Sequence, residues 1–77
     1  MTDWAKAYNG LSAAGFTDDQ IAGLAGVTRA VINSVRNGNY AFKHEPGYEG
    51  GKTVLANLTN AINLGWIDHD PLAEPTP

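Results

Sequence analysis

The chain contains no cysteine, so disulfide bridges and cysteine-based metal sites are excluded. It also has no apolar stretch that approaches the roughly 20 residues of a membrane-spanning helix. The opening sequence MTDWAKAYNG lacks the basic region and apolar run of a secretory signal peptide. We therefore expect a soluble cytoplasmic protein that does not contact a membrane.

Groups that could perform catalysis or bind a metal are scarce as well. The two histidines are His44 and His69, and neither completes a Ser–His–Asp or paired-carboxylate arrangement in the sequence. His69 stands between Asp68 and Asp70, but two acids beside a single histidine are usually solvated rather than bound to a metal. We expect no enzyme activity, no cofactor, no metal and no small-molecule substrate.

Positive charge is limited to five Lys and Arg against eight Asp and Glu, which gives a net charge of −3. An acidic total argues against nucleic acid, because neutralisation of phosphate supplies most non-specific affinity. The argument is weak, since the distribution of charge matters more than its sum. Residues 26–44 hold Arg29, Arg36 and Lys43 and no acid, whereas residues 1–25 and 45–77 are each net acidic.

The length of 77 residues allows one hydrophobic core and no second one. At this size a chain buries only about 60% of its unfolded surface, so a dimer partner would add stability. We place the folded domain at residues 1–67. Residues 68–77 hold three of the four prolines and three acids, which predicts a flexible acidic tail.

Apolar residues recur at the spacing of an amphipathic helix in four segments. We predict helices at about residues 3–14, 18–25, 28–37 and 52–64, and therefore an all-α domain of four to five short helices. Thr17 and Gln20 have the spacing of a capping box and set the start of the second helix. Gly26 then ends this helix, and Thr28 caps the third.

The segment 39–51 is rich in glycine, proline and aromatic residues and shows no helical period. It is compatible with an ordered loop, which we favour, or with a short hairpin that turns at Pro46 and Gly47. Its aromatic residues either pack back on the core or contact a protein or DNA: Tyr40, Phe42 and Tyr48.

Residues 18–37 have the features of two short helices that cross closely at a tight turn. Ala22 falls at the crossing, where a larger side chain would push the helices apart. Gly26 falls in the turn, where a positive φ is easy only for glycine. Aliphatic side chains fill the space between these helices and the rest of the domain: Ile21, Val27, Ile32 and Val35.

The stretch IAGLAGVTRAVINSVRNG resembles the helix-turn-helix of the phage Cro and lambdoid-repressor family. With the helices before and after it, the resemblance covers roughly residues 3–66. It implies a lambda-repressor-like DNA-binding domain whose second motif helix lies in the major groove of duplex DNA. Many members of the family begin the motif with glutamine, whereas this chain has Asp18 there and Gln20 two places further on.

The resemblance implies a base-reading face on the helix at 28–37. Arg29 could pair bidentately with guanine and Asn33 with adenine, while Ala30 could touch a thymine methyl group. The full set of expected base contacts is Thr28, Arg29, Ala30, Asn33 and Ser34. The expected phosphate contacts are Thr17, Gln20, Arg36, Asn37 and Lys43.

We therefore predict a sequence-specific transcription regulator, a small Cro-like repressor of a phage or prophage. It would bind duplex DNA as a homodimer on half-sites about 34–36 Å apart. We expect the dimer contact in the helix at 52–64 and at Trp66 and Ile67, which are apolar beside the polar tail. The alternatives are a helix-turn-helix protein that inhibits a host protein or acts as an antitoxin-like partner, and a purely structural helix pair.

Overall fold

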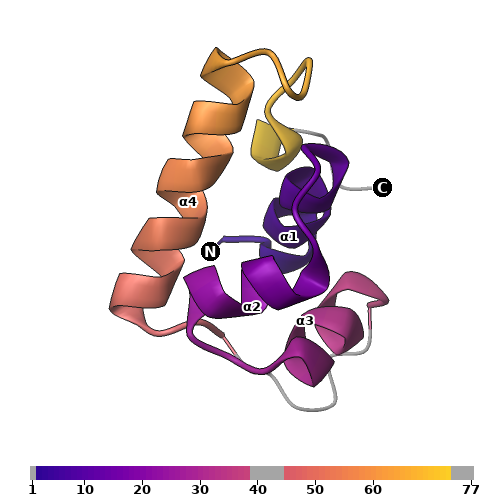
Figure 1. Ribbon diagram of the computed structural model, residues 1–77, viewed down its shortest axis with the longest axis vertical. Helices are drawn as coiled ribbons and strands as arrows, with labels where there is room; N and C mark the ends of the chain where they lie inside the picture. Colours follow the sequence, from indigo (N-terminus) through magenta and orange to yellow (C-terminus); the bar gives the residue numbers. More distant parts are fainter. Residues whose placement is uncertain (1, 39–44, 74–77) are drawn as a thin grey trace.

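The structure, a computed structural model, describes residues 2–38 and 45–73. These residues form no strand, so the predicted all-α fold is confirmed. None of the described helices is long and apolar enough to cross a lipid bilayer. The elements in chain order are α1 (Trp4–Ala13), α2 (Asp18–Ala25), α3 (Arg29–Arg36), α4 (Tyr48–Asn63) and the short 3-10 helix η1 (Pro71–Ala73) (Figure 1).

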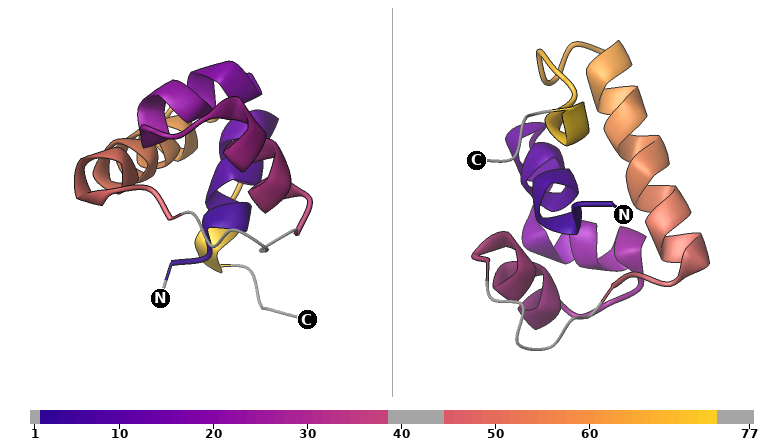
Figure 2. Two further views of the ribbon diagram at one scale, coloured as in Figure 1. Left: turned by 90° about the horizontal axis from the view of Figure 1, so that it is seen from below. Right: turned by 180° about the vertical axis from the view of Figure 1, so that it is seen from behind.

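The four helices enclose one core, and α3 lies at its edge. Helix α4 runs along the longest dimension of the molecule, 32 Å, with α1 facing it and α2 crossing below (Figure 1). The turned views place α3 at a corner beside α1 and α2, away from α4 (Figure 2). Among the described helices, α3 packs against α1 and α2 only. One side of α3 is therefore left uncovered by the other helices.

The core is built from the apolar faces of all four helices and from Ile67, which follows the turn after α4. Burial of these side chains is the main favourable contribution to folding. Trp4 and Phe16 are partly buried and pack against this core. The buried apolar residues are Ala7, Tyr8, Leu11, Ile21, Ala22, Ala25, Ile32, Val35, Val54, Leu58, Ala61 and Ile67.

Local sequence signals set the boundaries of α2 and α3 as predicted. The backbone N–H of Gln20 donates to Thr17 Oγ1 at 3.2 Å, and the N–H of Thr17 donates to Gln20 Oε1 at 2.9 Å. This capping box satisfies two amides that the helix itself leaves unpaired. Gly26 ends α2 in the left-handed conformation with φ of 72°. Thr28 then caps α3 by accepting from the N–H of Val31 at 3.3 Å.

Helix α4 begins at Tyr48, earlier in the chain than the predicted start at about residue 52. A Cβ atom on Gly50 would lie 2.0 Å from the carbonyl oxygen of Ala25, and one on Gly51 would lie 2.9 Å from the Trp4 ring. The two glycines therefore allow α4 to approach α2 and α1 closely. The same residues have low helix propensity, and so the sequence alone favoured a loop.

The structure has no hairpin turn at Pro46 and Gly47, the second alternative for the segment before α4. Pro46 and Gly47 lead directly into α4, and Gly47 is its N-terminal cap residue. Two of the aromatic residues of the segment, Tyr40 and Phe42, lie outside the described residues. Tyr48 is 81% exposed at the start of α4 and does not pack on the core.

The packed structure extends beyond residue 67, where the sequence predicted the start of a flexible tail. Pro71 is buried, and Leu72 packs against the core. A Cβ atom on Gly10 of α1 would lie 2.5 Å from Pro71 Cγ, so this glycine makes room for the proline ring. The prediction missed this contact because it joins residues far apart in the sequence. Residues 74–77 lie outside the described residues.

Candidate nucleic-acid interface

The turn between α2 and α3 is tight and well hydrogen-bonded. The backbone N–H groups of Gly26 and Val27 both donate to the carbonyl oxygen of Ala22, at 2.9 and 3.2 Å. Ala22 is 6% exposed, which agrees with its predicted place at the helix crossing. The turn leads directly into α3, whose Ile32 and Val35 are buried against the core. The opposite side of α3 must then face outward.

The outward side of α3 presents the residues predicted to contact bases. Thr28, Arg29, Ala30 and Asn33 are exposed, and Ser34 is half-buried. The Arg29 side chain is 69% exposed. Residues three and four apart lie on one helical face, and this spacing groups Arg29, Ala30, Asn33 and Ser34, whereas Thr28 is the N-cap residue that precedes α3. The structure thus brings four of the five predicted base contacts together on a surface of α3 that none of the described helices covers, and Thr28 lies exposed just before this helix.

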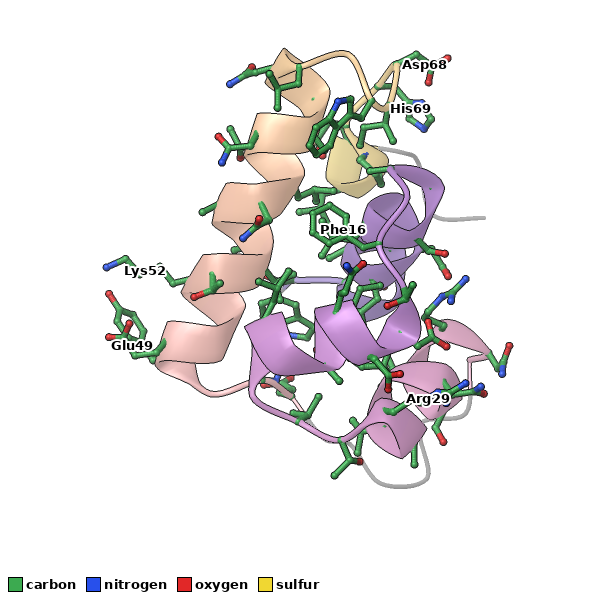
Figure 3. The ribbon with its side chains drawn as sticks, in the orientation of Figure 1. Phe16, Arg29, Glu49, Lys52, Asp68 and His69 are labelled. Atoms are coloured by element: carbon green, nitrogen blue, oxygen red, sulfur yellow. The ribbon has the colours of Figure 1, made fainter. Side chains whose placement is uncertain are left out.

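Arg29 lies at the first turn of α3, below the first turn of α2 (Figure 3). Its Nε atom is 3.9 Å from Asp19 Oδ1, and both side chains are largely exposed. An exposed ion pair at this distance contributes roughly 0.2–1 kcal/mol at most to stability. The two terminal nitrogens of Arg29 make no hydrogen bond with another residue in the described part of the chain.

Asn33 and Asn37 form a second polar group on the same face. Asn37 Nδ2 donates to Asn33 Oδ1 at 2.7 Å. An amide oxygen has two lone pairs, so Asn33 keeps one acceptor position and both of its N–H donors. Asn37, predicted as a phosphate contact, lies exposed at the end of α3.

Arg36, another predicted phosphate contact, turns toward the protein instead. Its Nη1 donates to Asp18 Oδ1 at 2.5 Å, and its Nε donates to Asn9 Oδ1 at 2.8 Å. The Arg36 side chain is 30% exposed and that of Asp18 is 19% exposed. Arg36 therefore ties α3 to both α1 and α2. No local pattern could have revealed this, because Asn9 and Asp18 are distant from Arg36 in the sequence.

The remaining predicted phosphate contacts divide into two groups. Thr17 and Gln20 are exposed at the start of α2, where each uses one side-chain oxygen in the capping box. The amide nitrogen of Gln20 is not part of that pair. Lys43 lies outside the described residues.

The charge of this surface differs from the net positive charge that residues 26–44 have in the sequence. That segment is positive in the sequence, but the fold brings Asp18 and Asp19 beside Arg36 and Arg29. Each arginine of α3 thus faces a carboxylate from the first turn of α2. Among the described residues, this surface is consequently rich in hydrogen-bonding groups but nearly balanced in charge, because Asp18 and Asp19 of α2 offset Arg36 and Arg29 of α3.

Other surface features lie away from α3. Leu64 and Trp66 are 62% and 55% exposed, and the Trp66 ring lies 6.4 Å from the Phe16 ring. His69 and Asp68 are hydrogen-bonded at 2.6 Å, which lowers the pKa of the exposed Asp68 carboxyl. Within residues 2–38 and 45–73, no three His, Cys, Asp or Glu side chains are grouped so that they could hold a metal ion.

The surface also has an open depression of about 490 Å³ between α1 and the segment after α4. Its lining combines apolar and polar residues. Lys6 and Asn9 of α1 stand on one side, and Trp66 and His69 stand on the other.

Comparison of the chain with protein-family models, with curated proteins and with solved structures finds no match in any of the three.

Proposed function

We propose that the protein binds duplex DNA in a sequence-specific manner and regulates transcription, with α2 and α3 acting as a Cro-like helix-turn-helix. The observation that supports this proposal most is the exposure of polar side chains on the outward face of α3. Arg29, Ala30 and Asn33 are exposed there together, and no described helix covers them. We place the activity in the cytoplasm of a bacterium or a phage-infected cell, as a small repressor.

In the proposed complex, the N-terminal part of α3 enters the major groove. The terminal nitrogens of Arg29 donate to O6 and N7 of a guanine, and the Asn33 amide pairs with an adenine. The Ala30 methyl group touches the methyl group of a thymine. Each bidentate pair is worth about 1–3 kcal/mol of discrimination against a wrong base. Ser34 lies beside these contacts on the same face, and the exposed Thr28 precedes α3 as its N-cap residue.

Phosphate contacts would come from the two ends of the motif. The amide nitrogen of Gln20 at the start of α2 and the exposed Asn37 at the end of α3 are two such donors. Lys43 keeps its proposed role, and Thr17 adds a hydroxyl group. Arg36 instead positions α3 through Asp18 and Asn9. With so few cations per chain, tight binding requires a second copy, and we propose a symmetric homodimer on two half-sites.

Selection from a random duplex library tests this function directly. We expect enrichment of a palindromic sequence that contains a guanine in each half-site. Arg29→Ala should weaken binding to this sequence by about 1–3 kcal/mol and relax the base preference at one position per half-site. Titration of both proteins against selected and random duplexes measures the effect. Equal loss of affinity for every sequence would show that Arg29 contacts the backbone instead.

Binding to a protein partner is the alternative function, and the near balance of charge among the described residues around α3 favours it. Asp18 and Asp19 offset both arginines of that helix, which lowers the attraction to phosphate. Such a protein would inhibit a host enzyme or act as an antitoxin-like partner. The same selection distinguishes the two functions, because an interaction protein enriches no DNA sequence at any salt concentration.

A further inference from the structure

Asp18 and Asp19 are neighbours at the start of α2, but the fold uses them differently. Asp18 is 19% exposed and is held by Arg36 in an ion pair that joins two helices. Asp19 is 73% exposed, and its carboxylate has one ionic partner in the described part of the chain, Arg29. A carboxylate in this exposed position contributes little to stability. Asp19 acts instead on Arg29, the residue proposed to contact a guanine.

The direction of the contact is the informative feature. Asp19 approaches Arg29 from its Nε side, with Nε and Oδ1 3.9 Å apart. The guanidinium group is a rigid planar fork, so when its Nε faces Asp19, the edge that carries the two terminal nitrogens points away from Asp19. The two terminal nitrogens remain, and these are the donors that match O6 and N7 of guanine.

We infer that Asp19 is a positioning residue that determines base specificity by orienting Arg29 toward guanine and away from phosphate. This inference rests on the proposed DNA-binding function. Holding Arg29 before DNA arrives reduces the rotamer entropy lost on binding. The negative charge of Asp19 also repels a phosphate that approaches Arg29. Both effects favour a bidentate base contact over a backbone contact, so the protein gains specificity and loses affinity for random DNA.

The experiment compares Asp19→Asn with the wild-type protein on three duplexes. These are the selected sequence, the same sequence with the Arg29-dependent guanine pair replaced, and a random duplex. Asp19→Asn keeps the side-chain shape and removes the charge. We expect higher affinity for random DNA and a discrimination ratio at that guanine that falls by about 1.4- to 5-fold, which corresponds to the 0.2–1 kcal/mol of an exposed ion pair. Asp19→Glu should restore part of the ratio.

Glu49→Gln provides the matched control, because it removes one charge from the first turn of another helix. Glu49 is exposed on α4, which makes no contact with α3 among the described residues, and it lies on the other side of the molecule from Arg29 (Figure 3). We expect this variant to leave the discrimination ratio unchanged. Thermal unfolding followed by circular dichroism would verify that each variant is folded.

The outcomes separate this inference from the function on which it rests. If the wild-type protein enriches no sequence, the proposed function fails, and the inference fails with it. If Arg29→Ala relaxes the guanine preference while Asp19→Asn raises affinity for all three duplexes equally, only the inference fails. Asp19 would then act through its charge alone. A selective fall of the ratio, partly restored by Asp19→Glu and absent in Glu49→Gln, supports the positioning role.

Discussion

Tyr8 is the largest side chain that the core encloses completely, and it carries a polar group. Its ring packs near the Trp4 ring, with 6.2 Å between centroids. The phenol oxygen has no hydrogen-bond partner in the described part of the chain. Burial raises the pKa of Tyr8 from 10.0 to about 12, because it disfavours the charged phenolate. The side chain stabilises the core through its ring and weakens it through its hydroxyl.

The raised pKa predicts a loss of stability at high pH. Above pH 10 the unfolded chain releases the Tyr8 proton while the folded chain retains it, so the unfolded state binds fewer protons. The free energy of unfolding should therefore fall by roughly 2 kcal/mol between pH 10 and about pH 12, the pKa values of Tyr8 in the unfolded and folded chains. This contribution is fully present below pH 10.

Tyr8→Phe removes the titrating group and is the direct comparison. At pH 7 we expect the variant to be as stable as the wild-type protein, or more stable by about 1 kcal/mol, since an unpaired buried hydroxyl is removed. Urea unfolding at pH 7, 9.5 and 11.5 measures both effects. Parallel loss of stability in the two proteins would contradict the role of Tyr8, because all other titrating groups are shared.

At the scale of elements, the pair formed by α2 and α4 shows how packing overrides local preference. The start of α4 contains Gly50 and Gly51, which weaken a helix by about 1 kcal/mol each relative to alanine. They are helical here because α4 packs closely on α2 and α1 at this point. Only glycine leaves room for the Ala25 carbonyl beside Gly50 and for the Trp4 ring beside Gly51. The sequence predicted the middle and end of this helix from its apolar spacing, but not its first turn.

Gly50→Ala tests that explanation. A Cβ atom there would lie 2.0 Å from the Ala25 carbonyl oxygen, so the helices must separate. We expect the free energy of unfolding to fall by about 1–3 kcal/mol, despite the better helix propensity of alanine. Gly23→Ala is the control, because Gly23 is exposed within α2 and its Cβ would meet nothing within 4 Å. That variant should gain about 0.5–1 kcal/mol. Chemical denaturation that shows the same sign for both would contradict the packing account.

At the scale of the whole molecule, two surfaces lie at opposite ends of the longest axis. α3 is at the lower end in Figure 1, and the turn after α4 is at the upper end. This turn contains the exposed Leu64 and Trp66. A contact between two copies at this turn would leave the proposed base-reading face open. Ile67, also predicted at the dimer contact, is 9% exposed and belongs to the core.

We therefore expect Trp66→Ser to weaken self-association. The wild-type protein should sediment as a dimer at high micromolar concentration. The dissociation constant of the variant dimer should be at least about 10-fold higher, because a large aromatic side chain is lost from the contact. Tyr48→Ser removes an aromatic side chain that is 81% exposed at the opposite end of α4, and it should leave the dimer intact. A wild-type protein that stays monomeric with and without DNA would rule out this interface.

The sequence by itself determined the all-α class, the boundaries of α2 and α3, and the residues on the outer face of α3. These features depend on contacts within a few residues: the capping box at Thr17, the left-handed Gly26, and the helical spacing of Ile32 and Val35. Their physical causes are local, so the order of side chains is enough to reveal them. The function proposed for that face remains a prediction.

The tertiary structure decided the first turn of α4, the packing of Pro71, and the different environments of the two arginines of α3. Arg29 and Arg36 cannot be told apart by charge or propensity, yet one is exposed and the other joins three helices. Each of these outcomes depends on atoms from segments that are distant in the chain: Ala25 beneath Gly50, Gly10 beneath Pro71, and Asp18 beside Arg36. Such contacts exist only after the helices have packed, because packing sets which distant groups meet.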